Sequence, residues 1–159
     1  MKMEILNSID SYYGTELMFK AIALILLSCA AIFDIRSKKI PVSFPFVQIL
    51  LSFIYCLYQL SAERANINDL LLSLFPGVLL IIICFISRQG LGLGDGLMAL
   101  SLGPVMGMTD MMLAIFIGFC FSAIASVILL AMHRVNGKST LAFIPFLTAG
   151  VGVMSFAFN

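Results

Sequence analysis

Residues 90–96 read Gly-Leu-Gly-Leu-Gly-Asp-Gly, four glycines and one acid between segments that are strongly apolar on both sides. So many glycines indicate a backbone that is not an ordinary helix. An acid at the edge of an apolar segment is costly, which makes it a candidate for function. A second such acid, Asp34, lies at the end of the first apolar segment. We interpret Asp34 and Asp95 as a candidate catalytic pair.

The composition places the chain in a lipid bilayer. Of its 159 residues, 62% are hydrophobic and 11% are charged, whereas a soluble domain has about 45–50% apolar and about 25% charged residues. The net charge of +1 and the lack of a basic tract argue against a nucleic-acid partner. The four cysteines form no Cys-x-x-Cys pair, so neither a metal site nor a disulfide is predicted.

Six apolar segments predict an all-α, polytopic helical bundle that forms a single membrane-embedded domain over residues 1–159. A membrane-spanning helix needs about 20 mostly apolar residues, with about 17 as a lower bound. The fourth segment is only about 18 Å long even when counted from Asp95, so we expect it to be short or broken. Pro76-Gly77 predicts a kink in the third. The segments cover residues 17–33, 44–60, 70–86, 97–106, 111–132 and 141–158.

The basic residues predict the orientation in the membrane, because cytoplasmic loops carry an excess of lysine and arginine. The bias places both termini outside, with residues 1–16 as an extracytoplasmic segment that shows no cleavable signal peptide. Of the eight acids, only Asp34 and Asp95 then fall on the cytoplasmic side. The cytoplasmic basic residues are Arg36, Lys38, Lys39, Arg88, Arg134 and Lys138, and the outer ones are Lys2 and Arg64.

Two carboxyl groups that lie close together share a proton near neutrality, because both cannot ionise easily. The ionised member can activate a water, while the protonated member donates a hydrogen bond to a substrate carbonyl and later assists the leaving amine. Such chemistry hydrolyses a peptide bond without a metal or another cofactor. The glycines near Asp95 would let an extended substrate approach the backbone. Alternatively, the acids are solvated or paired with nearby cations, and the glycines form an ordinary loop.

Two motifs resemble those of a known family. Residues 34–41 read Asp-Ile-Arg-Ser-Lys-Lys-Ile-Pro and residues 92–95 read Gly-Leu-Gly-Asp. Their spacing resembles the type IV prepilin peptidases, members of the GxGD group of intramembrane aspartyl proteases. Residues 138–150 resemble the family's pattern before its last helix, so the similarity runs from the first span to the last. It implies catalytic roles for Asp34 and Asp95, and motif or substrate-binding roles for Gly92, Gly94, Arg36, Ile40, Pro41 and Pro145.

The resemblance also implies a substrate and a location. The family cleaves a short, positively charged leader from pilin-like precursors, just after a glycine on the cytoplasmic side. These precursors carry an N-terminal leader and a hydrophobic helix, and they belong to type IV pilus, protein secretion and competence systems in the plasma membrane of prokaryotes. Larger members also have a cysteine-rich segment and methylate the new N-terminus. This chain has no such segment, so we expect peptidase activity without methyltransferase activity.

The chain departs from the family pattern at four positions, and two other functions remain as alternatives. Leu97 stands where a lysine is common, Val42 where an asparagine often follows Ile-Pro, and Ala142 and Ile144 replace a proline and a glycine. One alternative is a catalytically silent assembly factor that binds pilin-like helices. The other is a small proton-coupled transporter, which would favour acids near mid-membrane and repeat symmetry between halves. The sequence shows neither feature.

Overall fold

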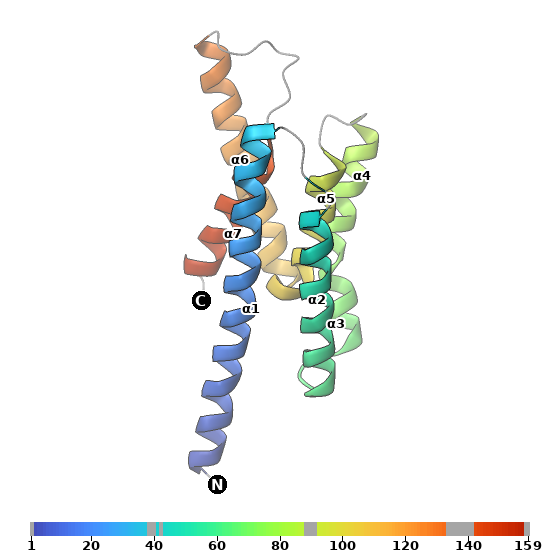
Figure 1. The fold of residues 1–159 in the computed structure, drawn as a ribbon, viewed down its shortest axis with the longest axis vertical. Coiled ribbons are helices and arrows are strands. Elements are labelled where there is room, and N and C mark those ends of the chain that lie inside the picture. The colour runs from blue at the N-terminus through green and yellow to red at the C-terminus, as the bar shows by residue number, and fades with distance from the viewer. Residues whose placement is uncertain (1, 38–40, 42, 88–91, 133–141, 158–159) are drawn as a thin grey trace.

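The structure, a computed structural model, is a bundle of helices (Figure 1) and describes residues 2–37, 41, 43–87, 92–132 and 142–157. Within these residues, four stretches are long and apolar enough to cross a membrane, while α5 and α7 are shorter apolar helices. The predicted helical membrane bundle is therefore confirmed. The helices are α1 (Lys2–Ser37), α2 (Ser43–Ser61), α3 (Ile67–Ser73), α4 (Phe75–Ile86), α5 (Leu93–Met106), α6 (Met108–Ala131) and α7 (Ile144–Ala157).

The six predicted segments all appear, with one of them divided. The third segment consists of α3 and α4, which meet at Leu74 immediately before the predicted kink at Pro76-Gly77. Proline is tolerated in the first turn of a helix, where its missing N–H is not needed. The fourth segment is α5, and its 14 residues span about 21 Å, less than the ~30 Å of hydrocarbon. Residues 2–16, expected as a separate N-terminal segment, belong to α1.

The glycine stretch is more helical than the sequence suggested. The expectation of non-helical backbone was wrong for residues 93–96, because α5 begins at Leu93. Gly92 is extended, with φ −71° and ψ 138°, and it precedes the first turn. The backbone N–H of Gly92 donates to Oδ2 of Asp95 at 3.3 Å, and the N–H of Asp95 donates to the carbonyl of Gly92 at 3.0 Å. A side chain that partners a free N–H beside a helix start stabilises that start.

Helix α5 is the central element of the bundle, because it contacts α1, α2, α3, α4 and α6. Small residues hold it against α3 and α4. A Cβ on Gly77 would overlap the backbone of Leu100, and a Cβ on Gly103 would overlap the carbonyl of Ser73. Such contacts are typical of helices that approach each other closely in membranes. They place α5 tightly beside the α3–α4 segment.

Helices α6 and α7 pack in the same manner. A Cβ on Gly150 would overlap the carbonyl of Ala114, and a Cβ on Gly118 would lie 3.2 Å from the carbonyl oxygen of Phe146. Helix α7 also packs against α1. The first turn of α7 is thereby held near the end of α1 at which Asp34 lies.

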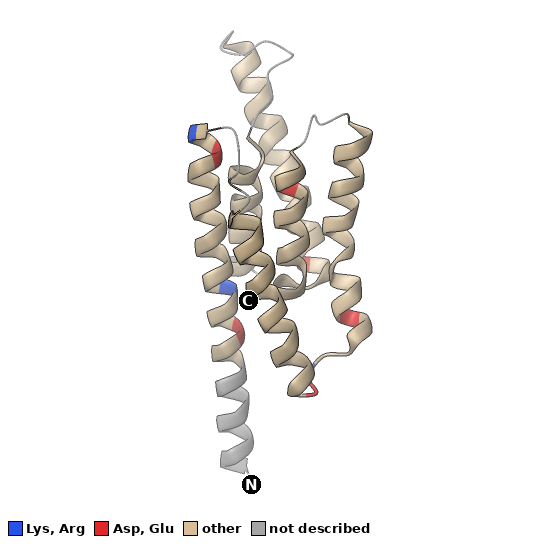
Figure 2. Cartoon of the chain, turned by 45° about the vertical axis from the view of Figure 1, so that its right-hand side comes forward, with Lys and Arg blue, Asp and Glu red and all other residues tan. Residues whose placement is uncertain are grey.

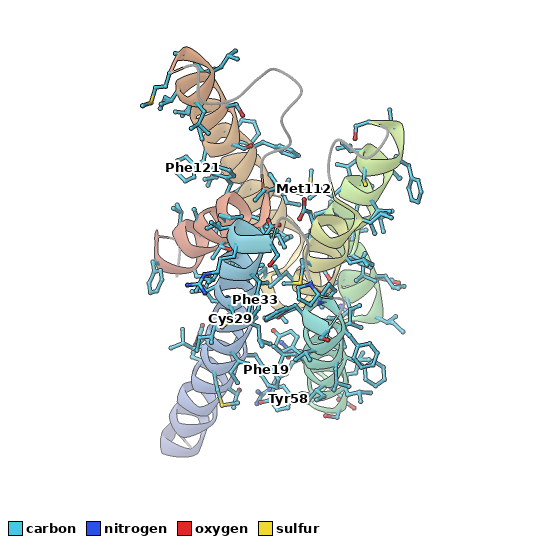
Figure 3. The ribbon with its side chains drawn as sticks, turned by 45° about the horizontal axis from the view of Figure 1, so that its top comes forward. Phe19, Cys29, Phe33, Tyr58, Met112 and Phe121 are labelled. Atoms are coloured by element: carbon cyan, nitrogen blue, oxygen red, sulfur yellow. The ribbon has the colours of Figure 1, made fainter. Side chains whose placement is uncertain are left out.

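Aromatic contacts connect α1 to α2. Phe19 stacks with Tyr58 at a ring-centroid distance of 6.2 Å, and Figure 3 shows these two side chains together between the helices. Further along, Phe33 lies 5.2 Å from Phe44. The pairs show that α1 and α2 run antiparallel, since residues late in α1 meet residues early in α2. Charged side chains are sparse along the bundle (Figure 2), as expected for helices in lipid.

One residue joins α5 to α6. Gly107 has φ 85° and ψ 161°, a combination that only glycine adopts readily. Its N–H donates to the carbonyl of Gly103 and its own carbonyl accepts from the N–H of Met111. The chain therefore reverses between α5 and α6 without a loop.

Candidate active site

Asp34 lies in α1, one turn before that helix ends, and its side chain faces the bundle interior. It is only 5% exposed, whereas its neighbours Phe33 and Ile35 are 47% and 63% exposed. The other helices bury this one face of α1. The backbone N–H of Ile144 is a hydrogen-bond donor to the carboxyl group of Asp34. Its second oxygen, Oδ2, is buried and has no hydrogen-bond partner among the described residues.

Asp95 lies in the first turn of α5 and is also 5% exposed. Its bond from the N–H of Gly92 fixes the carboxyl group at the helix start. The free N–H groups of this first turn and the helix dipole both favour a negative charge here. The glycines on either side leave little side-chain bulk around it. Gly92 is exposed and Gly94 is half-buried.

The two acids lie on adjacent helices at the same end of the bundle. Helices α1 and α5 are in contact, and the acids are near enough for the charge of Asp34 to act on Asp95. The two helices run antiparallel, so the C-terminal end of α1 lies beside the N-terminal end of α5. The juxtaposition that the predicted topology required is therefore present. A pair of buried carboxyl groups in this arrangement can divide the roles of general base and general acid.

The other predicted residues differ in their exposure, and some of them lie outside the described residues. Arg36, in the last turn of α1, and Pro41 are both exposed. Pro145 is half-buried in the first turn of α7, directly after Ile144. Ile40 lies outside the described residues, as do Val42 and five of the six basic residues that set the predicted orientation, namely Lys38, Lys39, Arg88, Arg134 and Lys138.

Sequence reasoning missed the N–H of Ile144. No pattern of side chains could have found it, because every residue except proline supplies this donor. Ile144 is the position at which the chain carries isoleucine instead of the family's glycine, and that change keeps the N–H. Ala142 and Leu97, two other departures, are half-buried and exposed, respectively. No cluster of three or more potential metal ligands occurs in the part of the chain that the structure describes.

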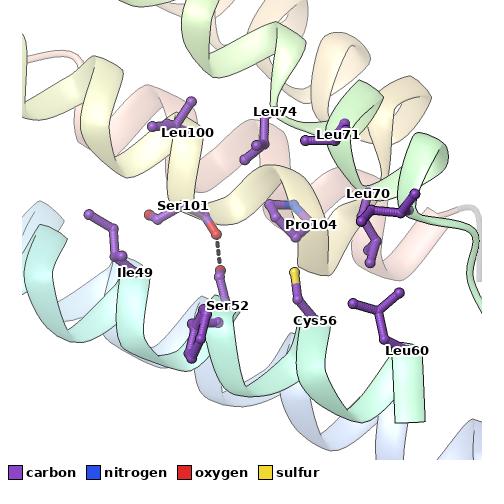
Figure 4. A pocket seen from close by; sticks show the side chains of 12 residues that line it. Ile49, Ser52, Cys56, Leu60, Leu70, Leu71, Leu74, Leu100, Ser101 and Pro104 are labelled. Atoms are coloured by element: carbon purple, nitrogen blue, oxygen red, sulfur yellow. Dashed lines mark hydrogen bonds between the residues drawn. The ribbon is translucent and has the colours of Figure 1, made fainter. Parts of the chain in front are cut away.

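A groove of about 340 Å³ lies between α2, α3 and α5, away from the acids. Figure 4 shows its wall of aliphatic side chains with Cys56 and Pro104 among them. Ser52 reaches across it to donate a hydrogen bond to the backbone carbonyl of Ser101. Among the described residues, no charged side chain lines this groove, so these residues offer an apolar surface and no group for acid–base chemistry.

Fold and site together define a multi-pass helical membrane protein with two acids buried at one end. Comparison with protein families identifies its place more closely: the model of the type IV leader peptidase family matches residues 21–127, a range that includes both aspartates. The chain therefore belongs to this peptidase family, which confirms the resemblance seen in the two motifs. Comparison with curated proteins and with solved structures gave no match.

Proposed function

We propose that the chain is an aspartyl endopeptidase that removes the leader from pilin-like precursors. The observation that carries this proposal is the burial of Asp34 and Asp95 on adjacent, antiparallel helices at one end of the bundle. Membership of the type IV leader peptidase family supports a peptidase. The buried carboxyl pair supports the aspartyl mechanism in particular.

In the proposed mechanism, the pair holds one proton between its two carboxyl groups. The ionised carboxyl takes a proton from a water, and the resulting hydroxide attacks the carbonyl carbon of the scissile peptide. The protonated carboxyl donates a hydrogen bond to the carbonyl oxygen and then supplies the proton to the departing amine. The peptide C–N bond breaks, and one water is consumed for each cleavage. The N–H of Ile144 keeps Asp34 oriented during these steps.

The proposed substrate has a leader with basic residues and a hydrophobic helix behind the cleavage site. Cleavage follows a glycine on the cytoplasmic face of the plasma membrane, with the N-terminus of the enzyme outside. The exposed Gly92 beside Asp95 supports the approach of an extended leader, since no side chain stands in its way. Arg36, Ile40, Pro41, Gly94 and Pro145 keep their proposed roles in the motifs or in substrate binding.

The test is cleavage of a pilin-type precursor by the purified protein in liposomes. We expect wild type to cut after the leader glycine, while Asp34→Asn and Asp95→Asn each lose at least about 100-fold in rate, the scale of general acid–base catalysis. Asp69→Asn is the matched control, because Asp69 is an exposed acid near the start of α3. Near wild-type turnover by either site variant would contradict the aspartyl mechanism.

The same reaction tests the proposed lack of methyltransferase activity. Mass spectrometry of the product, with a methyl donor present, should show the new N-terminus unmethylated. If folded wild type cleaves none of several precursors but binds them, the catalytically silent assembly factor becomes the better description. Proton flux into liposomes without cleavage would instead indicate the transporter.

A further inference from the structure

Helix α2 carries a row of buried polar side chains on the face that it turns toward the bundle. The row consists of Gln48, Ser52, Tyr55 and Gln59, each at most 5% exposed. Two of these donate a hydrogen bond: Ser52 to the carbonyl of Ser101, and Gln59, through Nε2, to the hydroxyl of Tyr55 at 2.6 Å. Oε1 of Gln59 has no hydrogen-bond partner among the described residues, but the other end of that amide is bonded to Tyr55. Gln48 lacks a partner at both ends of its amide.

Gln48 is 0% exposed, and neither Nε2 nor Oε1 of its side chain has a hydrogen-bond partner among the described residues. An amide that is buried without partners loses its hydrogen bonds to water and gains none in return, which is strongly unfavourable. Native buried polar groups are nearly always satisfied. A fully buried amide with two free ends therefore indicates a ligand that the protein chain does not itself supply.

The register of the helices places Gln48 toward the end of the bundle that holds the acids. Helices α2 and α5 run in the same direction, and Ser52 meets Ser101, so Gln48 lies level with the residues just after Asp95. Gln48 is therefore level with residue 97 of α5, which is two residues, or about 3 Å along the helix axis, beyond Asp95. On the other side, the pairs Phe33–Phe44 and Phe19–Tyr55 fix the register with α1. They place Gln48 level with residues 26–29 of α1, so its offset from Asp34 along the helix axis is five to eight residues, or about 7.5–12 Å.

Asp34 offers the complementary unsatisfied atom. Its Oδ2 is buried without a partner in the described part of the chain, and α1, which carries it, packs against both α2 and α5. The two groups are not hydrogen-bonded directly. A buried water makes two to four hydrogen bonds to polar groups that would otherwise be unsatisfied. One amide donor, one amide acceptor and one carboxyl oxygen supply the partners that such a water requires.

We propose that Gln48 is a positioning residue of the aspartate pair: its side-chain amide holds a buried water that is also hydrogen-bonded to Oδ2 of Asp34. The bridge completes the partners of Asp34, whose other contact is the N–H of Ile144. Gln48 thereby fixes the orientation of the carboxyl group from the side opposite α7. The inference rests on the proposed peptidase function for its kinetic consequence, but the bridge itself does not.

The test compares Gln48→Met with Gln59→Met in the full-length protein. Methionine has nearly the same shape as glutamine and cannot make the hydrogen bonds, and Gln59 lies on the same buried face of α2, three turns away. We expect Gln48→Met to lower kcat at least about tenfold with KM unchanged, because the carboxyl group of Asp34 loses its water-mediated partner. Gln59→Met should keep kcat and lose stability, because it breaks the bond to Tyr55.

A second readout does not depend on activity. In protein labelled with ¹³C at the aspartate carboxyl carbons, the Asp34 signal is assigned by its absence in Asp34→Asn. We expect Gln48→Met to shift this signal and Gln59→Met to leave it in place. If wild type cleaves nothing, the proposed function fails, and the shift alone decides the inference. An unmoved Asp34 signal, or wild-type kcat in Gln48→Met, would overturn the bridge.

Discussion

Asp34 and Asp95 show how differently two acids of the same type are held. Asp95 has a partner within its own helix start, the N–H of Gly92. Asp34 depends on another helix, because its donor is the N–H of Ile144 at the start of α7. A change in α7 should therefore disturb Asp34 and leave Asp95 in place.

The N–H of Ile144 can be removed without a change in the helix. We predict that Ile144→Pro lowers the cleavage rate about 10- to 100-fold, because a hydrogen bond to a charged group contributes about 1.5–3 kcal/mol. Proline suits the first position of a helix, so the start of α7 should persist. Ile144→Ala is the control, since it loses the buried side chain but keeps the donor. Equal rates in the two variants would show that the N–H does not support Asp34.

At the scale of residues, the sequence was enough to predict the two acids as candidate site residues, but not the hydrogen-bonding groups that surround them. Burial of an acid inside a membrane helix is rare, so a charge map alone singled out Asp34 and Asp95. The donor at Ile144 is a backbone group and leaves no signature in the sequence. Gln48 stood in the sequence as a polar residue in an apolar segment, but only the packing of α2 shows that it faces inward.

At the scale of elements, close contacts at glycines decide how α5 sits in the bundle. Gly103 approaches the carbonyl of Ser73, and Gly77 approaches the backbone of Leu100. The obstacle in both cases is backbone, which cannot rotate aside as a long side chain could. The position of Asp95 is therefore linked to the spacing between α5 and the α3–α4 segment.

We predict that Gly103→Ala destabilises the protein by about 1–3 kcal/mol, the usual cost of overpacking. The added methyl group must push α5 away from α3. The measurement is thermal unfolding in detergent, with Gly152→Ala as the control, since a Cβ at Gly152 meets nothing within 4 Å. An unfolding temperature for Gly103→Ala that equals that of the control would mean that the helices can separate at little cost.

The elements themselves were largely predictable, because apolar segments of about 20 residues have few other structures available in lipid. The start of α5 was not. Several glycines in a row normally argue against a helix, and here the bond between Asp95 and Gly92 supports a start at Leu93. The break between α3 and α4 was predicted at Pro76-Gly77, and it lies at Leu74. The two positions differ because proline fits the first turn of a helix, so α4 begins before Pro76.

At the scale of the whole molecule, the acids come from two different sets of helices. Asp34 belongs to α1, which packs extensively against α7, and α7 in turn against α6. Asp95 belongs to α5, which packs against α2 and α4. The site forms where the two sets meet. Large apolar side chains cover the outside of both, for example Phe46, Phe85 and Phe156, which are 68%, 68% and 83% exposed.

The single-residue connection at Gly107 makes the position of Asp95 sensitive to hydrophobic mismatch. Helix α6 has 24 residues, or about 36 Å, so a thin bilayer forces it to tilt. Without a loop to absorb that tilt, the displacement passes through Gly107 into α5 and reaches Asp95. We therefore predict that cleavage in phosphatidylcholine liposomes has an optimum as acyl-chain length increases, measured at constant reconstitution efficiency. A rate that does not vary with chain length would mean that the bundle, and not the membrane, sets the depth of Asp95.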